Sequence, residues 1–281
     1  MEIVFLGSAG GRVAVFKQFR SSGGFIVRSE KTNIHIDPGP GALIRLTQIG
    51  LKPEETDAFV VSHKHLDHCT DINTLIEAKT MGSWNKSGTL LTPESALTED
   101  PIVLRYTLKN LERISILKED FSEYIKGIRV TVSMKHKHQD VETYGLIFEN
   151  NGEKLGYITD GRFEEKMIEA YSGCDAIIIN MTFIKERDMD HLNMKDAIRL
   201  IKGIRPKIAI INHTGMEVIL TGYSKVEKEL EDATGIKTIV AREFLKVSFP
   251  SMEFSKIKLK NPIGIRSLDE WRQEHSKRTD S

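Results

Sequence analysis

Metal-binding side chains are concentrated in one short segment of this chain, Ser62-His63-Lys64-His65-Leu66-Asp67-His68. Three of the nine histidines lie within six residues, and an aspartate stands between the second and the third. Imidazole and carboxylate groups are the nitrogen and oxygen ligands that divalent transition metals favour. Residues 57–62, with the apolar run Ala58-Phe59-Val60-Val61, are typical of a buried strand, which would hold the ligands rigidly at a sheet edge. The segment predicts a metal site that stays open to substrate.

The spacing within this segment separates its ligands into two pairs. His63 and His65 are two residues apart, so on an extended chain their side chains face the same way and can bind one ion. Asp67 and His68 follow after a turn, and we expect them to bind a second ion nearby. Two metals about 3.5–4 Å apart form a clamp for in-line displacement reactions. The alternative, a solvated turn that happens to be rich in histidine, does not explain this spacing.

Length and composition narrow the class of protein. A chain of 281 residues can bury a large core in one domain or two. Lys+Arg and Asp+Glu both number 40, so the net charge of zero gives no overall signal for binding nucleic acid or an anionic membrane. The two cysteines, Cys69 and Cys174, provide no disulfide framework, and we expect a reducing cytoplasm. We expect neither a signal peptide nor a membrane-spanning helix.

Strand and helix patterns alternate along the chain and indicate how the ligands are positioned. Strands are predicted at 2–6, 24–28, 32–36, 57–62, 90–92, 129–138, 143–149, 154–159, 175–180 and 207–211. Helices are predicted at 42–49, 71–80, 101–111, 161–171 and from the N-cap Asn193 to Gly203. This order predicts an α/β protein in which helices cover two sheets. We expect one domain over 1–250, and a polar segment over 251–281 that wraps the surface or frays.

Further metal-capable residues stand where other apolar strands end. His138, Asp160 and His213 each follow a predicted strand, and this repeated placement suggests that they complete the site. His136 shares a face with His138, and we prefer His138 as the ligand because it lies at the end of the strand. His136 and His35 are expected to be buried residues that do not bind the metal.

The motif His63-x-His65-x-Asp67-His68, with its downstream ligands and the turn Asp37-Pro38-Gly39-Pro40-Gly41, resembles the metallo-β-lactamase superfamily over about residues 1–249. The resemblance implies an αββα sandwich of two mixed sheets flanked by helices. It implies one metal ion held by His63, His65 and His138, a second held by Asp67, His68 and His213, and Asp160 bridging the two. Zinc is the expected metal, and manganese and iron are the alternatives.

The segment around His191 resembles one subgroup of that superfamily. In ribonuclease Z and the related cyclic-phosphate phosphodiesterases, the matching histidine contacts the phosphate and can help the leaving group depart. His191 also precedes a predicted helix start, where anions bind, and the alternative is a purely structural histidine beside the N-cap. Two features depart from the subgroup. Asn180 stands where an acidic residue is often found, and residues 83–117 lack the glycine-rich, basic arm that grips tRNA.

These observations lead to a main hypothesis and two alternatives. The chain is interpreted as a dinuclear metal-dependent hydrolase, a phosphodiesterase for a small or cyclic phosphodiester or RNA. Asp67 would orient or deprotonate the attacking water, and His191 would stabilise the phosphate or protonate the leaving group. The first alternative is a carboxyl-ester, lactone or thioester hydrolase with the same fold. The second is a non-catalytic metal- or nucleic-acid-binding protein. The sequence leaves a monomer and a homodimer both open.

Overall fold

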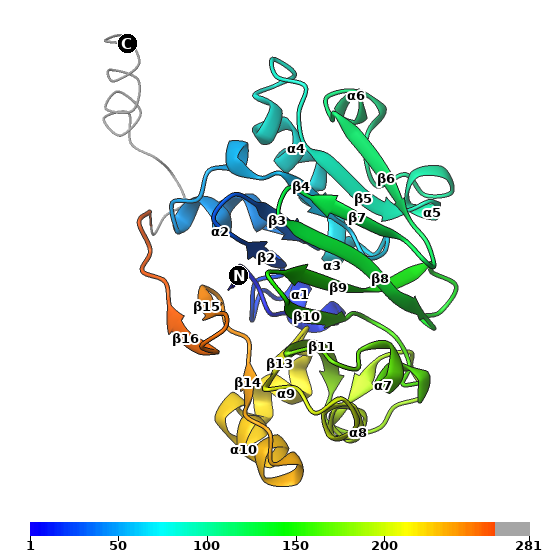
Figure 1. Ribbon diagram of the computed structural model, residues 1–281, viewed down its shortest axis with the longest axis vertical. Helices are drawn as coiled ribbons and strands as arrows, with labels where there is room; N and C mark the ends of the chain where they lie inside the picture. Colours follow the sequence, from blue (N-terminus) through cyan, green and yellow to red (C-terminus); the bar gives the residue numbers. More distant parts are fainter. Residues whose placement is uncertain (262–281) are drawn as a thin grey trace.

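Two β-sheets pack face to face in the computed structural model, and helices cover the outer face of each sheet (Figure 1). The structure describes residues 1–261. The predicted αββα sandwich is confirmed, and both sheets are mixed because each contains parallel and antiparallel strand pairs. Within residues 1–261, no helix is long and apolar enough to cross a bilayer.

Each sheet contains eight strands. In spatial order, the first sheet consists of β16 (Glu253–Lys256), β15 (Leu245–Ser248), β1 (Glu2–Phe5), β2 (Phe25–Arg28), β3 (Asn33–Ile36), β4 (Ala58–Val60), β5 (Thr89–Pro93) and β6 (Arg113–Leu117). The second consists of β14 (Thr238–Val240), β13 (Ile208–Asn212), β11 (Ala176–Phe183), β10 (Glu153–Ile158), β9 (Thr143–Asn150), β8 (Ile128–His136) and β7 (Ser122–Ile125), with β12 (Leu192–Asn193) beside β11.

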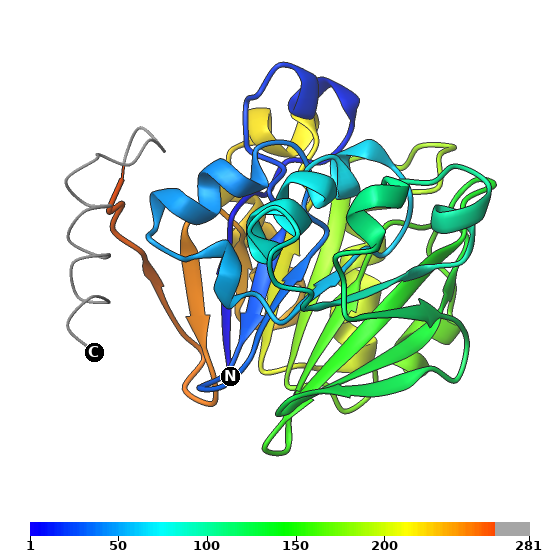
Figure 2. The same cartoon turned by 90° about the horizontal axis from the view of Figure 1, so that it is seen from above.

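The helices are short and lie between the strands in sequence. They are α1 (Arg12–Phe16), α2 (Ala42–Gln48), the 3-10 helix η1 (Pro53–Glu55), α3 (Leu66–Cys69), α4 (Ile72–Thr80), α5 (Ser95–Thr98), α6 (Arg105–Leu108), α7 (Lys166–Ala170), α8 (Met194–Ile204), α9 (Met216–Thr221) and α10 (Tyr223–Thr234). Helices α2 and α4 cover the first sheet, and α7, α8 and α10 cover the second. Figure 2 shows the dark blue segment with α1 projecting beside the yellow α9.

The strands near the middle of both sheets are apolar on both faces, which explains their continuous hydrophobic sequences. In β1, Ile3 and Phe5 point into the core between the sheets, whereas Val4 packs toward the layer of α2 and α4. In β11, Ile178 points into the same central core, while Ile177 packs under α8. The period-2 alternation of strands therefore divides each strand between two cores.

The ends of several strands meet at one edge of the sandwich. Strands β10, β11 and β13 are parallel, and β8 runs in the same direction because it and β10 are both antiparallel to β9. The carboxyl ends of these four strands therefore lie together at that edge. His138 follows β8, Asp160 follows β10, and His213 follows β13. The topology thus collects residues that are far apart in sequence.

Two predicted helices are much shorter than expected. The predicted helix 101–111 is reduced to α6, because Asn73 of α4 accepts hydrogen bonds from Leu104 N at 2.8 Å and Thr107 Oγ1 at 2.9 Å. These bonds fix an extended Leu104 as the N-cap residue. The predicted helix 161–171 is reduced to α7, because the Arg162 amide donates to Lys137 O at 2.8 Å. Tertiary hydrogen bonds have replaced local helical ones in both segments.

The C-terminal segment and the end of α8 also differ from expectation. Part of the predicted polar tail is β16, which pairs antiparallel with β15, so the first sheet continues past residue 250. The remaining tail residues, 262–281, lie outside the described residues. Helix α8 passes through Gly203 and ends at Ile204, and Arg205 caps it in a left-handed conformation. Strands β6, β7, β14 and β15 and helix α10 were not predicted.

Candidate metal centre

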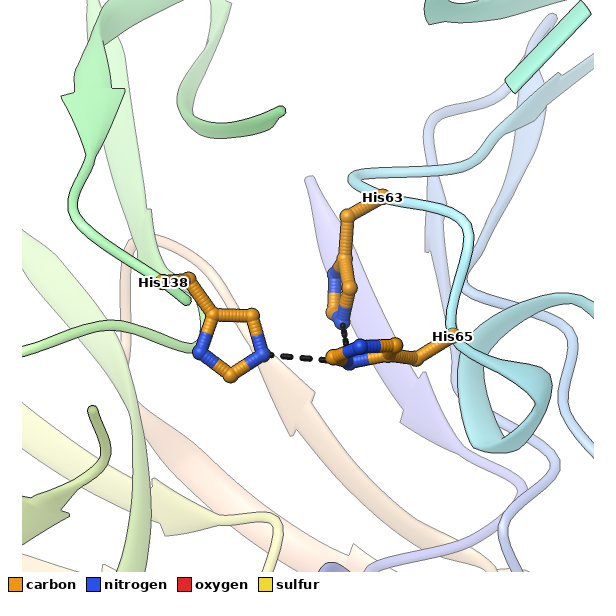
Figure 3. A group of neighbouring side chains, drawn as sticks. All are labelled: His63, His65 and His138. Atoms are coloured by element: carbon orange, nitrogen blue, oxygen red, sulfur yellow. Dashed lines mark hydrogen bonds between the residues drawn. The ribbon is translucent and has the colours of Figure 1, made fainter. Parts of the chain in front are cut away.

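Three histidine side chains converge at the edge of the sandwich. His63 Nε2 lies 3.1 Å from His65 Nδ1, and His138 Nε2 lies 3.1 Å from the same atom. Figure 3 shows the three rings pointing toward one another, two from the loop after β4 and one from the segment after β8. His63 lies in a bend beyond the end of β4 and His65 is the N-cap residue of α3, so the period of a continuous strand is not the reason for their convergence.

A second group lies directly beside the first. His68 Nε2 is 3.1 Å from His213 Nε2, and His213 Nε2 is 3.2 Å from Asp67 Oδ2. Asp160 Oδ2 lies between the two groups, 3.4 Å from His213 Nε2, 3.6 Å from His68 Nε2 and 3.9 Å from His138 Nε2. The structure therefore brings together all seven residues that were predicted as metal ligands.

The outer nitrogens of four of these rings are occupied by protein partners. The contacts are His63 Nδ1 with Ser62 Oγ at 3.0 Å, His68 Nδ1 with Asp37 Oδ2 at 2.9 Å, His138 Nδ1 with Asp190 O at 2.8 Å, and His213 Nδ1 with Thr182 Oγ1 at 3.0 Å. Hydrogen bonds of this kind fix the tautomer and orientation of metal-binding histidines. Each ring thereby presents its other nitrogen to the cluster.

Asp37 anchors the floor of the site. This buried carboxylate accepts hydrogen bonds from Ser62 N at 2.7 Å, Ser62 Oγ at 2.8 Å, Tyr157 OH at 2.7 Å and His68 Nδ1 at 2.9 Å. Asp37 comes from the predicted turn after β3, whereas Tyr157 belongs to β10 of the other sheet. One side chain therefore ties both sheets to the ligand loop.

Asn180, which departs from the expected acidic residue, supports Asp160 in this site. Its Nδ2 donates to Asp160 Oδ1 at 2.8 Å and to Tyr157 OH at 3.1 Å. Because Oδ1 is held by the amide, Oδ2 of Asp160 faces the histidines. An amide at position 180 can donate a hydrogen bond to the Asp160 carboxylate, which an ionised acid at this position could not do.

Burial and neighbouring charges determine the protonation of these groups. Burial disfavours the charged form of Asp160, but the nearby His213, His68 and His191 outweigh it and hold the pKa of Asp160 well below its usual value. Burial likewise opposes protonation of His68, yet the carboxylates of Asp160 and Asp67 raise its pKa well above the usual value. The carboxylates of Asp160 and Asp67 and the imidazole of His68 thus stabilise each other's charged forms.

Burial has the opposite outcome for His63 and His65. The pKa of His63 is well below its usual value because burial and the neighbouring His68 both disfavour a second cation. Burial and the nearby His138 lower the pKa of His65 to about 4. Neutral imidazoles with free lone pairs are the form that binds a metal.

The donor set fits divalent transition metals. Ligand atoms about 2.1 Å from a tetrahedral ion lie roughly 3.4 Å from each other, and the contacts of 3.1–3.4 Å within each group are close to this value. Four overlapping triads have ligand atoms within 4.8 Å of one another, namely His63/His65/His138, His63/His68/Asp160, Asp67/His68/His213 and His138/Asp160/His191. The triads give room for either one or two ions, and their oxygen and nitrogen atoms suit zinc, manganese or iron.

His191 also lies in the cluster. Its Nδ1 is 3.3 Å from Thr182 Oγ1 and 3.4 Å from Asp160 Oδ2. The side chain of Asn193 caps the backbone N–H groups of Lys195 and Asp196 at the start of α8, so these two donors are already paired, and the anion site at this helix start stays a prediction. Burial lowers the pKa of His191 to about 4, so the ring is neutral at physiological pH.

Close backbone packing fixes the His213 loop against the N-terminal loop. His213 has a left-handed φ of 56°, which aims its ring back over the sheet edge. A Cβ atom on Gly10 would lie 2.1 Å from His213 Nδ1, so only glycine fits at that position. Thr214 N donates to Ser8 O at 2.7 Å and completes the contact between the two loops.

The other predicted histidines lie outside the cluster as expected. Both side chains are buried. His136 Nε2 forms a hydrogen bond with Tyr171 OH at 2.9 Å, and His35 Nε2 donates to Gly23 O at 2.9 Å. The sequence interpretation missed the supporting roles of Thr182 and Asp190. Asp190 is adjacent to His191 in sequence, but Thr182 follows an apolar strand segment and carries no signal of its own.

Comparison with known proteins agrees with this geometry. Residues 32–214 match the family described as the beta-lactamase superfamily domain. The chain is 34% identical over 256 residues to the uncharacterized protein MJ1374 of Methanocaldococcus jannaschii. The aligned region covers 88% of this chain and 94% of that protein. The chain therefore belongs to the metallo-β-lactamase superfamily of metal-dependent hydrolases, and the predicted family is confirmed.

Solved structures show the same fold at low sequence identity. The metallo-β-lactamase fold protein YhfI from Bacillus subtilis aligns with a TM-score of 0.76 at 18% identity, covering 87% of this chain and 98% of that one. A diphosphatase of the PhnP family gives 0.67 at 18% identity, with coverages of 88% and 97%. Human tRNase Z, short form, gives 0.63 at 15% identity, with coverages of 89% and 100%. The resemblance to the subgroup that includes ribonuclease Z is thus found at the level of the fold.

Proposed function

We propose that this protein is a phosphodiesterase that holds two divalent ions, most readily zinc, and cleaves a small or cyclic phosphodiester or a short RNA. The observation that carries this proposal is the placement of His191 beside the ligand groups. Its ring centroid is 5.0 Å from that of His138 and 5.9 Å from that of His213. A nitrogen donor beside the ligands is suited to a phosphoryl oxygen that carries negative charge.

A hydrogen-bond chain through Thr182 can place the proton of His191 on the nitrogen that faces substrate. When His213 offers Nε2 to the cluster, its Nδ1–H donates to Thr182 Oγ1. The Thr182 hydroxyl can then donate its own proton to His191 Nδ1. In this arrangement the remaining proton of a neutral His191 lies on Nε2, where it can donate to substrate. The chain thus makes His191 a hydrogen-bond donor, and its low pKa argues against transfer of its proton to the leaving group.

Asp67 and the bound metal ions would act on the attacking water and on the phosphoryl oxygens. Asp67 is 23% exposed, so its carboxylate can reach a water at the mouth of the site as well as the cluster. Burial opposes ionisation of Asp67, but His68 and His213 outweigh it and hold its pKa low, so the carboxylate is ionised at neutral pH and can orient a water by accepting a hydrogen bond from it. Bound divalent ions would lower the pKa of water and neutralise charge on the phosphoryl oxygens.

The comparisons support the class of reaction without specifying the substrate. The similar PhnP-family protein is a diphosphatase and the similar human protein is a tRNase, and both act at phosphorus–oxygen bonds. Small substrates are favoured over tRNA because the segment around β5 and α5 shows no excess of basic residues.

We also keep the homodimer as a prediction, to be tested by the mass of the protein in solution.

A pair of substrates and two variants test the proposal. Zinc-, manganese- and iron-loaded protein is assayed on bis(p-nitrophenyl) phosphate and on p-nitrophenyl acetate. We expect diester cleavage, and we expect His191→Ala to reduce it about 100-fold while metal content and any acetate hydrolysis stay unchanged. His191→Gln keeps a neutral N–H donor and should restore part of the loss, which a proton-transfer role would not allow.

Two outcomes would contradict the phosphodiesterase proposal. Absence of diester cleavage with every metal would count against any role at phosphorus. Acetate hydrolysis that exceeds diester cleavage and does not respond to His191→Ala would favour the carboxyl-ester hydrolase instead.

A further inference from the structure

An ion-paired clamp lies just outside the ligand groups and is built around Asp190. Arg162 Nε donates to Asp190 Oδ1 at 2.6 Å, and Gln139 N donates to Asp190 Oδ2 at 2.8 Å. The same residue uses its main chain as well, because Asp190 O accepts the Nδ1–H of His138 at 2.8 Å. Three contacts from two segments thus meet on one residue, and the next residue in the chain is His191.

Arg162 connects the Asp190 clamp to the segment that carries His138, because both its backbone and its side chain form hydrogen bonds. Its backbone N–H donates to Lys137 O at 2.8 Å, one residue before the ligand His138. Its side chain reaches Asp190 through Nε and Asp188 through Nη2 at 2.8 Å. Asp160, the carboxylate between the two ligand groups, is only two residues before Arg162. Arg162 therefore joins the segments after β8 and β10 to the loop before β12.

The two carboxylates that Arg162 contacts are unequal. The Asp188 side chain is 96% exposed, so water screens that pair. The Asp190 side chain is only 12% exposed, and both of its carboxylate oxygens are bound. The contact with Asp190 is therefore the one that can fix the position of the 188–191 loop relative to Arg162. A guanidinium fork offers two N–H directions at once, which a lysine ammonium on its flexible stem does not reproduce.

We propose that Arg162 is a positioning residue that, through Asp190, holds His138 and His191 in their orientations toward the metal centre. The contact with His138 bears on metal binding by this superfamily member, and the part concerning His191, the residue after Asp190, rests on the proposed phosphodiesterase function. Loss of the clamp would free the 188–191 loop, so that the carbonyl of Asp190 would no longer fix the ring of His138. Supporting hydrogen bonds of this kind typically change metal affinity or activity by about 10–100-fold.

Substitutions of Arg162 and Asp190 separate geometry from charge. Arg162→Ala removes the clamp, Arg162→Lys keeps the positive charge without the fork, and Asp190→Asn weakens the partner while leaving its backbone carbonyl in place. Arg129→Lys is the matched control, since Arg129 forms a similar 3.0 Å pair with Glu149 at the far end of β8. Thermal unfolding of each variant reports whether the fold is intact.

The first measurement is the rate of zinc transfer from the loaded protein to a colorimetric chelator, which requires no substrate. We expect Arg162→Ala and Arg162→Lys both to release zinc about tenfold faster, and Arg129→Lys to match the unmodified protein. Arg162→Lys that behaves like the unmodified protein would overturn the proposal, because charge alone would then be sufficient. Release that is equally fast in the Arg129→Lys control would overturn it as well.

The second measurement is kcat and KM on bis(p-nitrophenyl) phosphate. We expect the Arg162 variants to lower kcat about tenfold with KM within about twofold, and we expect the double variant with Asp190→Asn to lose little more than Arg162→Ala. Additive losses in the double variant would contradict a shared clamp. If no diester is cleaved, the proposed function fails, but the zinc-release result still decides whether Arg162 positions His138.

Discussion

Replacement of Asp37 by alanine should affect both the stability and the metal binding of this protein. The Asp37 carboxylate accepts four hydrogen bonds, and two of its donors, Ser62 N and His68 Nδ1, have no other acceptor among the described residues. Ser62 Oγ and Tyr157 OH can still pair with Thr159. Alanine would therefore leave two buried donors unpaired and would detach the ring of His68.

The size of the effect follows from these contacts. A buried donor without an acceptor costs about 1–3 kcal/mol, so two such donors are expected to lower the free energy of unfolding by about 4 kcal/mol. Asp37 also has a left-handed φ of 48°, which alanine tolerates less well than aspartate or asparagine. Asp37→Asn should cost less, about 1–3 kcal/mol, because an amide oxygen can still accept part of the network.

The assay is urea unfolding of the metal-free protein together with zinc titration of each variant. Zinc affinity should fall about 10–100-fold for Asp37→Ala and less for Asp37→Asn. Asp175→Asn is the control, since Asp175 lies at the opposite end of β11 and accepts a hydrogen bond from Lys154 N at 2.9 Å. An alanine variant with unchanged unfolding energy and unchanged zinc affinity would refute the reasoning.

Three further outcomes are expected. The pKa of His68 is raised, so zinc must displace its proton. Zinc affinity should therefore increase from about pH 6 to pH 8, by at most about tenfold per pH unit. Zinc titrations that show no dependence on pH would contradict this. Burial lowers the pKa of His35 from 6.5 to about 4, so the folded state excludes a proton that the unfolded state binds; stability should decrease by about 3 kcal/mol as the pH falls through this range, and less so in His35→Gln, as measured by urea unfolding. Gly10→Ala should displace His213 and impair zinc binding, whereas Gly127→Ala, whose Cβ would meet only an ordinary 3.6 Å contact, should bind zinc normally.

Local sequence patterns predicted much of the sandwich and the position of the ligands within it. Apolar runs identified most of the central strands, because a strand buried on both faces must be apolar throughout. The patterns failed where local preference competed with tertiary hydrogen bonds, as at Asn73, which shortens the predicted helix 101–111. They also missed the edge strands β6 and β7, in which exposed polar residues such as Arg113 and Ser122 alternate with apolar ones that are themselves partly exposed.

The sequence by itself determined which side chains could bind a metal, because ligand chemistry depends on residue type and the residues stand at the ends of apolar strands. Only the tertiary structure decided how those side chains meet. The parallel order of β10, β11 and β13 brings Asp160 within 3.4 Å of His213, although 53 positions separate them in the chain. The structure likewise shows that His191 contacts Thr182 Oγ1, and that Asn193 pairs two of the backbone donors at the start of α8. Distances between segments remote in sequence depend on sheet order and packing, which no local pattern encodes.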